Sequence, residues 1–272
     1  MNMLVNGELL ATGARAIGAQ DRGLQYGDGL FETMRIVKGR VRFWEEHYAR
    51  LRLGCERLNM SAPARDLLER EIAQLIGESP NAVLKLLVTR GESGRGYRPA
   101  SDSKTTRILS VHPVPEISPA GIAVRWCATR MARNARLAGV KHLNRLEQVL
   151  AQNEWRDERL AEGLMLDTEG ELVCATAANV FIMSEGVLVT PDLRFSGVRG
   201  VMRGQVLAAA RAHEIEIDER SVWPDELLAA SEVFVTNAVR GIRSVVALAD
   251  ATWPVGPIAS RLAAILELDS RA

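Results

Sequence analysis

Residues 138–151 read AGVKHLNRLEQVLA and place a lysine, Lys141, just before a segment with helical periodicity. Asn144 is suited to cap the first turn of that helix. A lysine beside small apolar residues loses solvation, and desolvation favours the neutral amine, which is the nucleophilic form. Taken alone, the stretch also fits an ordinary surface lysine, and we expect His142 to be structural. The chemistry of Lys141 therefore depends on what the rest of the chain supplies.

Three further segments combine glycines with charged residues. Residues 21–29, DRGLQYGDG, are typical of a tight turn where the backbone approaches another group closely. Residues 89–99, TRGESGRGYRP, carry three arginines, and guanidinium groups bind carboxylates through paired hydrogen bonds. Residues 196–203, SGVRGVMR, lead glycines into a helix, whose first N–H groups bind phosphate. Each segment alone also fits an ordinary loop or helix start, but together with Lys141 they suit an enzyme that uses pyridoxal 5'-phosphate (PLP) on an acidic substrate.

Composition excludes several other classes of protein. The 272 residues are 47% hydrophobic and 25% charged, as in a globular protein with a real core. Lysine plus arginine equals aspartate plus glutamate, 34 each, so nothing indicates binding to nucleic acid or to an anionic membrane. The three cysteines have no metal-ligand spacing and predict neither a metal site nor a disulfide framework. The first residues do not resemble a signal peptide and no apolar run is long enough to span a membrane, so we expect a cytoplasmic protein.

Hydrophobic periodicity predicts two lobes that mix strands and helices, in an α/β and α+β arrangement. An Asn-Gly turn at residues 6–7 predicts a hairpin of residues 3–5 and 8–11. The predicted strands are 30–37, 41–44, 82–89, 106–111, 122–129, 163–166, 171–174, 179–183, 187–189 and 233–236, and the predicted helices are 44–58, 64–76, 144–154, 199–212 and 258–266. Three prolines in residues 111–120 predict a linker at 113–120. We therefore expect a smaller N-terminal domain, 1–112, and a larger C-terminal domain, 121–272, that carries Lys141.

The segment around Lys141 resembles the active-site segment of aminodeoxychorismate lyases. These belong to the two-domain, fold-type IV PLP enzymes, whose relatives include branched-chain and D-amino-acid aminotransferases. The similarity covers essentially the whole chain, and its strings occur in the order and spacing of the family: DRGLQYGDGLFET, HYARL at 47–51, RGESGRGY at 90–97, AANVF at 177–181, GVRGVMR at 197–203 and FVTNAVRGIRSV at 234–245. KHLNRLEQVLA and RGY are the strings that favour the lyases over the aminotransferases.

The resemblance implies roles for individual residues. Lys141 would bind PLP covalently, and Arg50 would pair with the cofactor phosphate. The backbone N–H groups of Val201 and Met202, with the region of Asn237 and Ala238, would complete the phosphate site. The residues expected near the substrate are Arg95 first, then Tyr97 and Arg240, with Tyr26 and Thr33.

Position 174 departs from the family pattern. Five residues before the asparagine of AANVF the family normally has a glutamate that faces the pyridine nitrogen and keeps it protonated, whereas this chain has Cys174. A thiol is only a weak hydrogen-bond donor and acceptor. We therefore expect the substitution to weaken transamination more than lysis, because forming an aromatic product drives the lysis.

The resemblance implies a homodimeric lyase that converts 4-amino-4-deoxychorismate to 4-aminobenzoate and pyruvate in folate biosynthesis. One alternative is a D-amino-acid or branched-chain aminotransferase of the same fold. The other is a catalytically silent PLP-binding or dimer-forming homologue, for which Cys174 is the only supporting feature.

Overall fold

The structure is a computed structural model that describes residues 3–11, 13–77, 81–101, 103–116 and 121–269. Its contacts divide the chain into two compact units. One contains residues 1–115 with 140–144, and the other contains 116–139 with 145–272. The lysine segment thus groups with the N-terminal unit and not with the C-terminal domain, where we expected it, because it pairs with a strand of the first sheet. Residues 117–120 of the expected linker lie outside the described residues.

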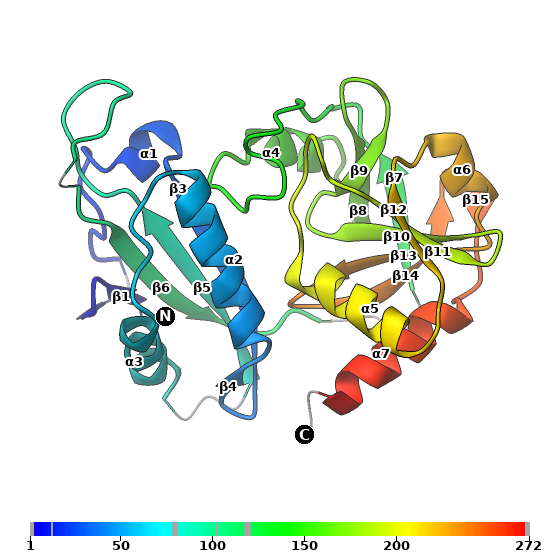
Figure 1. Cartoon of the computed structure of the whole chain (residues 1–272), viewed down its shortest axis with the longest axis horizontal. Helices are drawn as coiled ribbons and strands as arrows, with labels where there is room; N and C mark the ends of the chain where they lie inside the picture. The colour runs from blue at the N-terminus through cyan, green and yellow to red at the C-terminus, as the bar shows by residue number, and fades with distance from the viewer. Residues whose placement is uncertain (1–2, 12, 78–80, 102, 117–120, 270–272) are drawn as a thin grey trace. The chain divides into compact units, whose positions relative to one another are not determined.

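The first unit is built on a six-stranded sheet with the order β2-β1-β6-β5-β3-β4, in which all neighbours are antiparallel (Figure 1). Its strands are β1 (Met3–Val5), β2 (Glu8–Leu10), β3 (Gly29–Val37), β4 (Arg40–Val41), β5 (Asn81–Thr89) and β6 (Thr106–His112). The Asn-Gly hairpin is confirmed as β1 and β2, and Asn6 has the positive φ that this turn requires.

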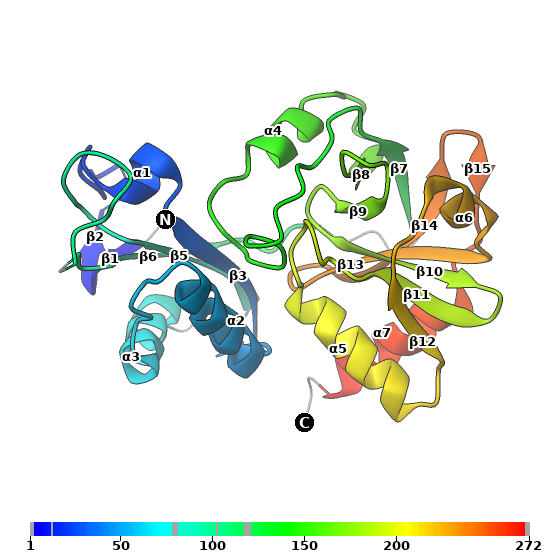
Figure 2. The ribbon, with the colours of Figure 1, turned by 45° about the horizontal axis from the view of Figure 1, so that its top comes forward.

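Helices α2 (Trp44–Arg57) and α3 (Arg65–Ile76) lie on the same side of this sheet (Figure 2). Successive side chains of β3 point to opposite faces of the sheet, and those of Leu30, Met34 and Ile36 face these helices. They form a buried core with residues such as Leu51 and Leu68. A short helix, α1 (Arg22–Tyr26), lies within the 21–29 segment that we expected to be a tight turn.

The second unit is built on a nine-stranded mixed sheet of order β12-β11-β10-β13-β14-β7-β8-β9, with β15 paired to β14. The β14–β7, β7–β8 and β11–β12 pairs are parallel, and the other pairs are antiparallel. Its strands are β7 (Ile122–Trp126), β8 (Leu160–Leu166), β9 (Leu172–Ala175), β10 (Asn179–Ser184), β11 (Val187–Pro191), β12 (Ile217–Arg220), β13 (Glu232–Asn237), β14 (Gly241–Leu248) and β15 (Ala251–Thr252).

Helices cover both faces of this sheet. Phe181 and Phe234 lie opposite each other on β10 and β13 and stack with ring centroids 5.1 Å apart. Helices α5 (Val201–Ala212) and α7 (Pro257–Asp269) pack on each other and on this part of the sheet (Figure 2). The core of the other face includes residues of α6 (Pro224–Ala229). The α4 helix (Leu146–Gln152) packs on β8.

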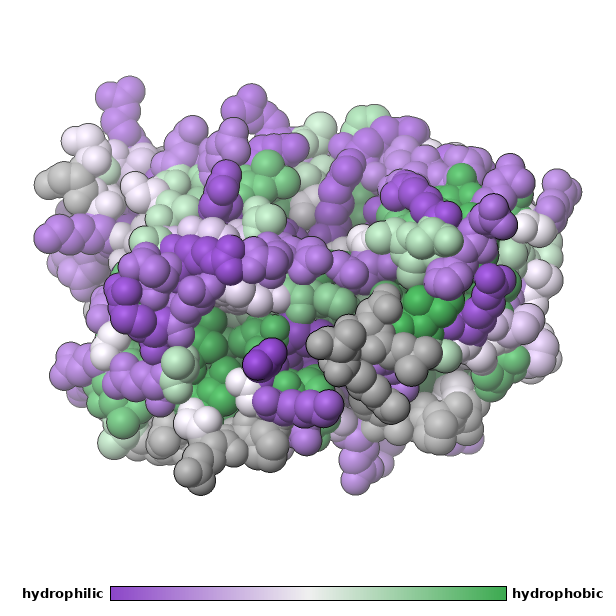
Figure 3. Space-filling view, turned by 60° about the horizontal axis from the view of Figure 1, so that its bottom comes forward, coloured by the Kyte–Doolittle hydropathy of each residue, from purple (hydrophilic) through white to green (hydrophobic). Residues whose placement is uncertain are grey.

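The outer surface agrees with the balanced composition. Figure 3 shows one face of the molecule, on which hydrophilic side chains surround separate hydrophobic areas. In the described parts of the chain, no helix is long and apolar enough to cross a membrane.

Candidate active site

Lys141 is held at the edge of β3 in the first unit. Its carbonyl oxygen accepts a hydrogen bond of 3.0 Å from the N–H of Phe31, and the N–H of Leu143 donates to Gly29 over 2.9 Å. The Lys141 ammonium nitrogen lies 4.1 Å from the centroid of the Phe31 ring, within cation–π distance. Backbone pairing and one aromatic face therefore fix a half-buried lysine.

Asn144 does not cap the α4 helix as we predicted. Arg145 occupies the N-cap position without a side-chain cap, and the Asn144 amide donates to the carbonyl of Gly27 over 3.0 Å. The asparagine therefore ties the lysine segment to the end of α1.

A buried carboxylate lies on the neighbouring residue of β3. Glu32 is 2% exposed and faces α2, where the Nδ1 of His47 lies 2.7 Å from its Oε2. The Nε of Arg50 donates to Glu32 Oε1 over 2.8 Å, and a second guanidinium nitrogen bonds to Oε2. The predicted phosphate ligand Arg50 is therefore already oriented by a fork-shaped ion pair.

The charges of this cluster follow from its burial. Burial alone would raise the pKa of Glu32, but the charge of Arg50 and the hydrogen bonds from His47 and Arg50 lower it to about 2. Burial, together with the charges of Arg50 and Lys141, lowers the pKa of His47 below its usual value, although Glu32 acts to raise it. Glu32 is thus ionised and His47 neutral at pH 7. The neutral His47 ring carries its proton on Nδ1, and this N–H donates a hydrogen bond to Glu32.

Sequence reasoning missed Glu32, His47 and Lys85. A signal for Glu32 was available, because alternation along β3 places it on the same face as the core residues Leu30 and Met34. Lys85 lies on β5 directly opposite Thr33, and its ammonium nitrogen is 6.0 Å from the Phe31 ring centroid. Thr33, Lys85 and the lysine over Phe31 thus share one face of the first sheet.

The predicted phosphate site in the second unit lies where α5 begins. Gly200 is the N-cap of this helix, and its N–H donates to Asn179 Oδ1 over 3.1 Å. The Asn179 amide in turn donates to the carbonyl of Val198 over 2.8 Å. A helix leaves its first N–H groups without partners in the helix, and those of Val201 and Met202 belong to this first turn. The start of α5 therefore has the donors that phosphate requires.

The end of β13 adds polar groups beside this helix start. Thr236 pairs directly with Asn179 across the sheet and is 1% exposed. Among the described residues its hydroxyl oxygen has no hydrogen-bond partner. Asn237 Oδ1 accepts from the N–H groups of Val239 and Arg240, over 3.1 and 2.7 Å, and so orders the turn that contains Ala238. A buried, unpartnered hydroxyl next to a helix N-terminus fits a phosphate group.

Cys174 lies on β9 and is 7% exposed. Its Sγ is 3.7 Å from the sulfur of Met131, within a small apolar cluster. Burial raises the pKa of this thiol to about 12. Cys174 is therefore a neutral thiol at pH 7 and cannot supply the negative charge of a glutamate.

The predicted substrate residues fall into separate groups. Tyr26 ends α1, and its ring contacts that of Tyr97 edge-on with centroids 5.6 Å apart. Arg95 is exposed in the same loop as Tyr97. Thr33 lies on β3, and Arg240 follows β13 in the second unit.

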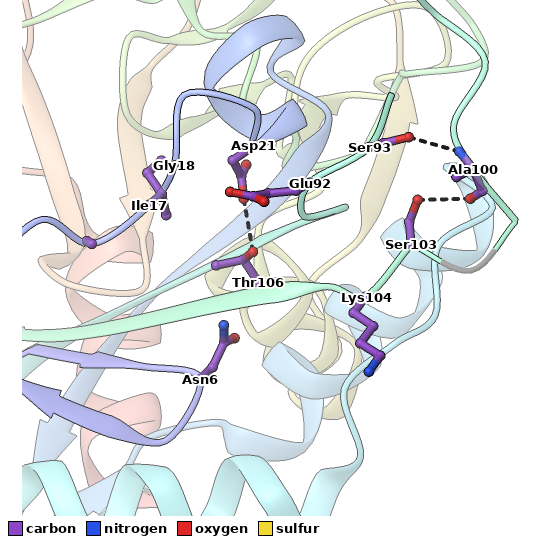
Figure 4. A pocket seen from close by; sticks show the side chains of 11 residues that line it. Asn6, Ile17, Gly18, Asp21, Glu92, Ser93, Ala100, Ser103, Lys104 and Thr106 are labelled. Carbon is purple, nitrogen blue, oxygen red and sulfur yellow. Dashed lines mark hydrogen bonds between the residues drawn. The ribbon is translucent and has the colours of Figure 1, made fainter. Parts of the chain in front are cut away.

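A polar cavity of about 550 Å³ in the first unit is a separate feature (Figure 4). Lys141 is not among the residues that line it. Its buried carboxylate, Asp21, accepts hydrogen bonds from the hydroxyls of Thr89 and Thr106, both 2.9 Å, and from the N–H of Gly23 at 2.8 Å. We assign the carboxylate a structural role, because these donors already satisfy it.

Comparisons with known proteins identify the family of this chain. Residues 29–248 match the family described as amino-transferase class IV, and the chain belongs to this family. PLP is the cofactor of the family. The lysine beside Phe31, and the α5 start beside the Thr236 hydroxyl, fit this cofactor.

Within the family, lyases are among the most similar relatives. The crystal structure of 4-amino-4-deoxychorismate lyase from Pseudomonas aeruginosa is 42% identical, covers 98% of both chains and has a TM-score of 0.91. An aminodeoxychorismate lyase from Vibrio harveyi is 31% identical over 89% of this chain and 92% of its own length. A putative branched-chain-amino-acid aminotransferase from Methanocaldococcus jannaschii is 30% identical over 89% of this chain and 86% of its own length.

Proposed function

We propose that this chain is a PLP-dependent lyase that converts 4-amino-4-deoxychorismate to 4-aminobenzoate and pyruvate. The observation that carries the proposal is Lys141, fixed by backbone pairing to β3 with its amine over Phe31, inside a segment that resembles the lyases. The similarity to the lyase from Pseudomonas aeruginosa over nearly all of both chains supports it.

The cofactor roles follow the resemblance to the lyases. We assign its covalent attachment to Lys141 and its phosphate to Arg50 and to the backbone N–H groups of Val201 and Met202. Asn237 and Ala238 would complete the phosphate site through the turn that Asn237 orders. Cys174 would lie at the ring nitrogen, where a neutral thiol replaces a carboxylate.

The reaction needs one residue that moves a proton. PLP supplies an electron-accepting ring that stabilises negative charge on the substrate carbon next to its amine. The Lys141 amine, which the substrate amine would have displaced from the cofactor, takes the proton from that carbon, and general-base catalysis of this kind typically contributes about 10²–10⁴-fold. The bond between the ring carbon and the enolpyruvyl oxygen then breaks and the ring becomes aromatic. Lys141 returns the proton to the departing enolpyruvate, which leaves as pyruvate.

The substrate carries two carboxylates, which cationic side chains would bind. We assign this role first to Arg95 and then to Arg240, with Tyr97, Tyr26 and Thr33 as further contacts. Lys85 supports the assignment of Thr33, because it adds an ammonium group directly opposite it.

An aminotransferase is the competing function, because relatives in the same family carry that name. The purified, PLP-loaded protein should form pyruvate and 4-aminobenzoate in equal amounts from 4-amino-4-deoxychorismate. It should transfer little amine from branched-chain or D-amino acids to 2-oxoglutarate. The opposite pattern would replace the lyase with an aminotransferase, and no turnover of either kind would indicate a silent homologue.

We also propose that the protein is a homodimer and acts in folate biosynthesis, as the resemblance to the lyases implies, and that it is cytoplasmic. The α4 helix supports a dimer, because Leu146, Val149 and Leu150 form an exposed apolar stripe along it. Sedimentation of the purified protein at the mass of one chain would contradict the dimer.

A further inference from the structure

Arg22 is a buried guanidinium whose donors reach a distant loop. The residue lies in α1 and is 3% exposed. Its Nη1 donates to the carbonyl of Gly96 over 2.9 Å and its Nη2 to that of Tyr97 over 2.8 Å. Its Nε donates to Asp28 over 2.9 Å. All three nitrogens of one side chain are thus engaged, two of them by consecutive carbonyls of the 89–99 loop.

Asp28 fixes the direction in which Arg22 points. The same carboxylate accepts from the Nε of Arg90 over 2.7 Å, and Arg90 also donates to the carbonyls of Leu58 and Asn59 after α2. Burial would raise the pKa of Asp28, but its hydrogen bonds and ion pairs with Arg90 and Arg22 hold it below the usual value. The carboxylate therefore stays ionised at neutral pH and keeps Arg22 aimed at the loop.

The tip of the loop contains two glycines. Gly94 and Gly96 are exposed, and Gly96 has a φ of +92°. At the base of the loop, Ser93 accepts from the N–H of Ala100 (Figure 4). Flexible glycines would let such a tip sample many conformations unless its carbonyls were held.

Arg22 also reaches the side chain of Tyr97 through an aromatic contact. Its guanidinium carbon lies 4.8 Å from the centroid of Tyr26, whose ring contacts that of Tyr97. Even with this contact, Tyr97 is 87% exposed. The backbone and the ring of Tyr97 therefore depend on the same arginine.

We propose that Arg22 is a positioning residue for substrate recognition, which holds the loop tip so that Arg95 and Tyr97 present a fixed surface to the carboxylates of the substrate. The inference rests on the proposed lyase function. The role of Arg22 is to act through the loop, and we assign it no contact with the substrate or the cofactor. Its loss should weaken substrate binding and leave the chemical step to Lys141.

The test compares Arg22→Lys with Arg107→Lys in the PLP-loaded protein. A lysine keeps the charge beside Asp28 but cannot donate in parallel to two carbonyls. Arg107 is a matched control, because it forms a comparable buried ion pair in the same unit and its guanidinium donates to Glu71 rather than to the loop. Arg22→Lys should raise the KM for 4-amino-4-deoxychorismate roughly tenfold, with kcat changed less than about twofold. Trypsin should also cleave after Arg95 faster, while Arg107→Lys leaves KM and this cleavage unchanged.

A second variant perturbs the loop without touching Arg22. In Gly96→Ala a side chain is forced onto a positive φ, although the added carbon meets no atom within 4 Å. It should raise KM in the same way, and it remains informative if Arg22→Lys does not fold. If the unmutated protein turns over the substrate and the folded variants keep its KM, the inference is overturned and the proposed function stays intact. A loss of kcat alone in the variants would have the same meaning. No turnover by the unmutated protein would overturn the proposed function and this inference with it.

Discussion

Replacing Glu32 by glutamine should cost the protein a measurable part of its stability, and the cost should depend on pH. The carboxylate has a pKa of about 2 in the folded protein, against 4.5 for an unperturbed glutamate. At about 1.36 kcal/mol for each pH unit, that difference corresponds to about 3 kcal/mol. The effect arises because Glu32 is buried between Arg50 and His47, so its removal takes away the buried carboxylate that accepts hydrogen bonds from both.

The sign of the pH dependence follows from the lowered pKa. The stabilisation is fully present above pH 4.5, where the carboxylate is ionised in the folded and unfolded chains. It is lost as the pH falls through the folded value of about 2, because Glu32 is then protonated in both states. The difference in free energy of unfolding between the unmutated protein and Glu32→Gln should therefore be largest at neutral pH and shrink below pH 4.

Urea denaturation of the PLP-free protein at pH 7, 4 and 3 measures this difference. Asp66→Asn is the control, because it breaks an ion pair with Arg70 that is exposed to solvent and should hardly move the midpoint. An equal loss of stability in Glu32→Gln at every pH would refute the argument from the buried charge. A urea midpoint of Glu32→Gln at pH 7 equal to that of the unmutated protein would also refute it.

Three further outcomes follow from the second unit and the thiols. Gly200→Ala should weaken PLP binding about tenfold or more in a fluorescence titration, because the added Cβ would lie 2.1 Å from Asn179 Oδ1. The control Gly204→Ala has open space around its added Cβ and should bind PLP as the unmutated protein does. Equal affinities of the two variants would contradict a phosphate site at α5. Cys174→Glu should change the lyase rate and the absorbance spectrum of the PLP-loaded protein, and an unchanged rate and spectrum would remove any role for this position. The three cysteines are buried and should react with a thiol reagent at pH 8 only after unfolding, so rapid labelling of the native protein would contradict their burial.

Local patterns predicted much of the fold. The Asn-Gly hairpin, the α2 and α3 helices and β3, β5 and β6 appear close to their predicted bounds, because turn chemistry and alternation agree with the tertiary structure there.

The α1 helix and β14 were not predicted. In α1 five residues form a helix between the Asp21 cap and Gly27, a string whose glycines suggest a turn. In β14 the buried Arg243 pairs with Glu162 of β8 over 2.7 Å, so a charged residue interrupts the pattern of a buried strand. Arg22 of α1 likewise donates to the distant carbonyls of Gly96 and Tyr97, so the polar residues of both elements find their partners only on folding.

The candidate site was only partly visible in the sequence. Lys141 and the glycines before α5 could be identified from local strings, since helix starts and special backbone positions leave local signals. The pairing of Arg50 with Glu32, and the bonds from Arg22 to the 89–99 loop, could not, because each joins segments brought together only by folding.

The proposed lyase activity depends on the amine of Lys141. The most direct test supplies 4-amino-4-deoxychorismate to the purified, PLP-loaded protein and follows 4-aminobenzoate by fluorescence, beside Lys141→Ala and the control Lys104→Ala, an exposed lysine. We expect product from the unmutated protein and from Lys104→Ala, and none from Lys141→Ala. Product formation that survives Lys141→Ala, or its absence from the PLP-loaded unmutated protein, would contradict the claim.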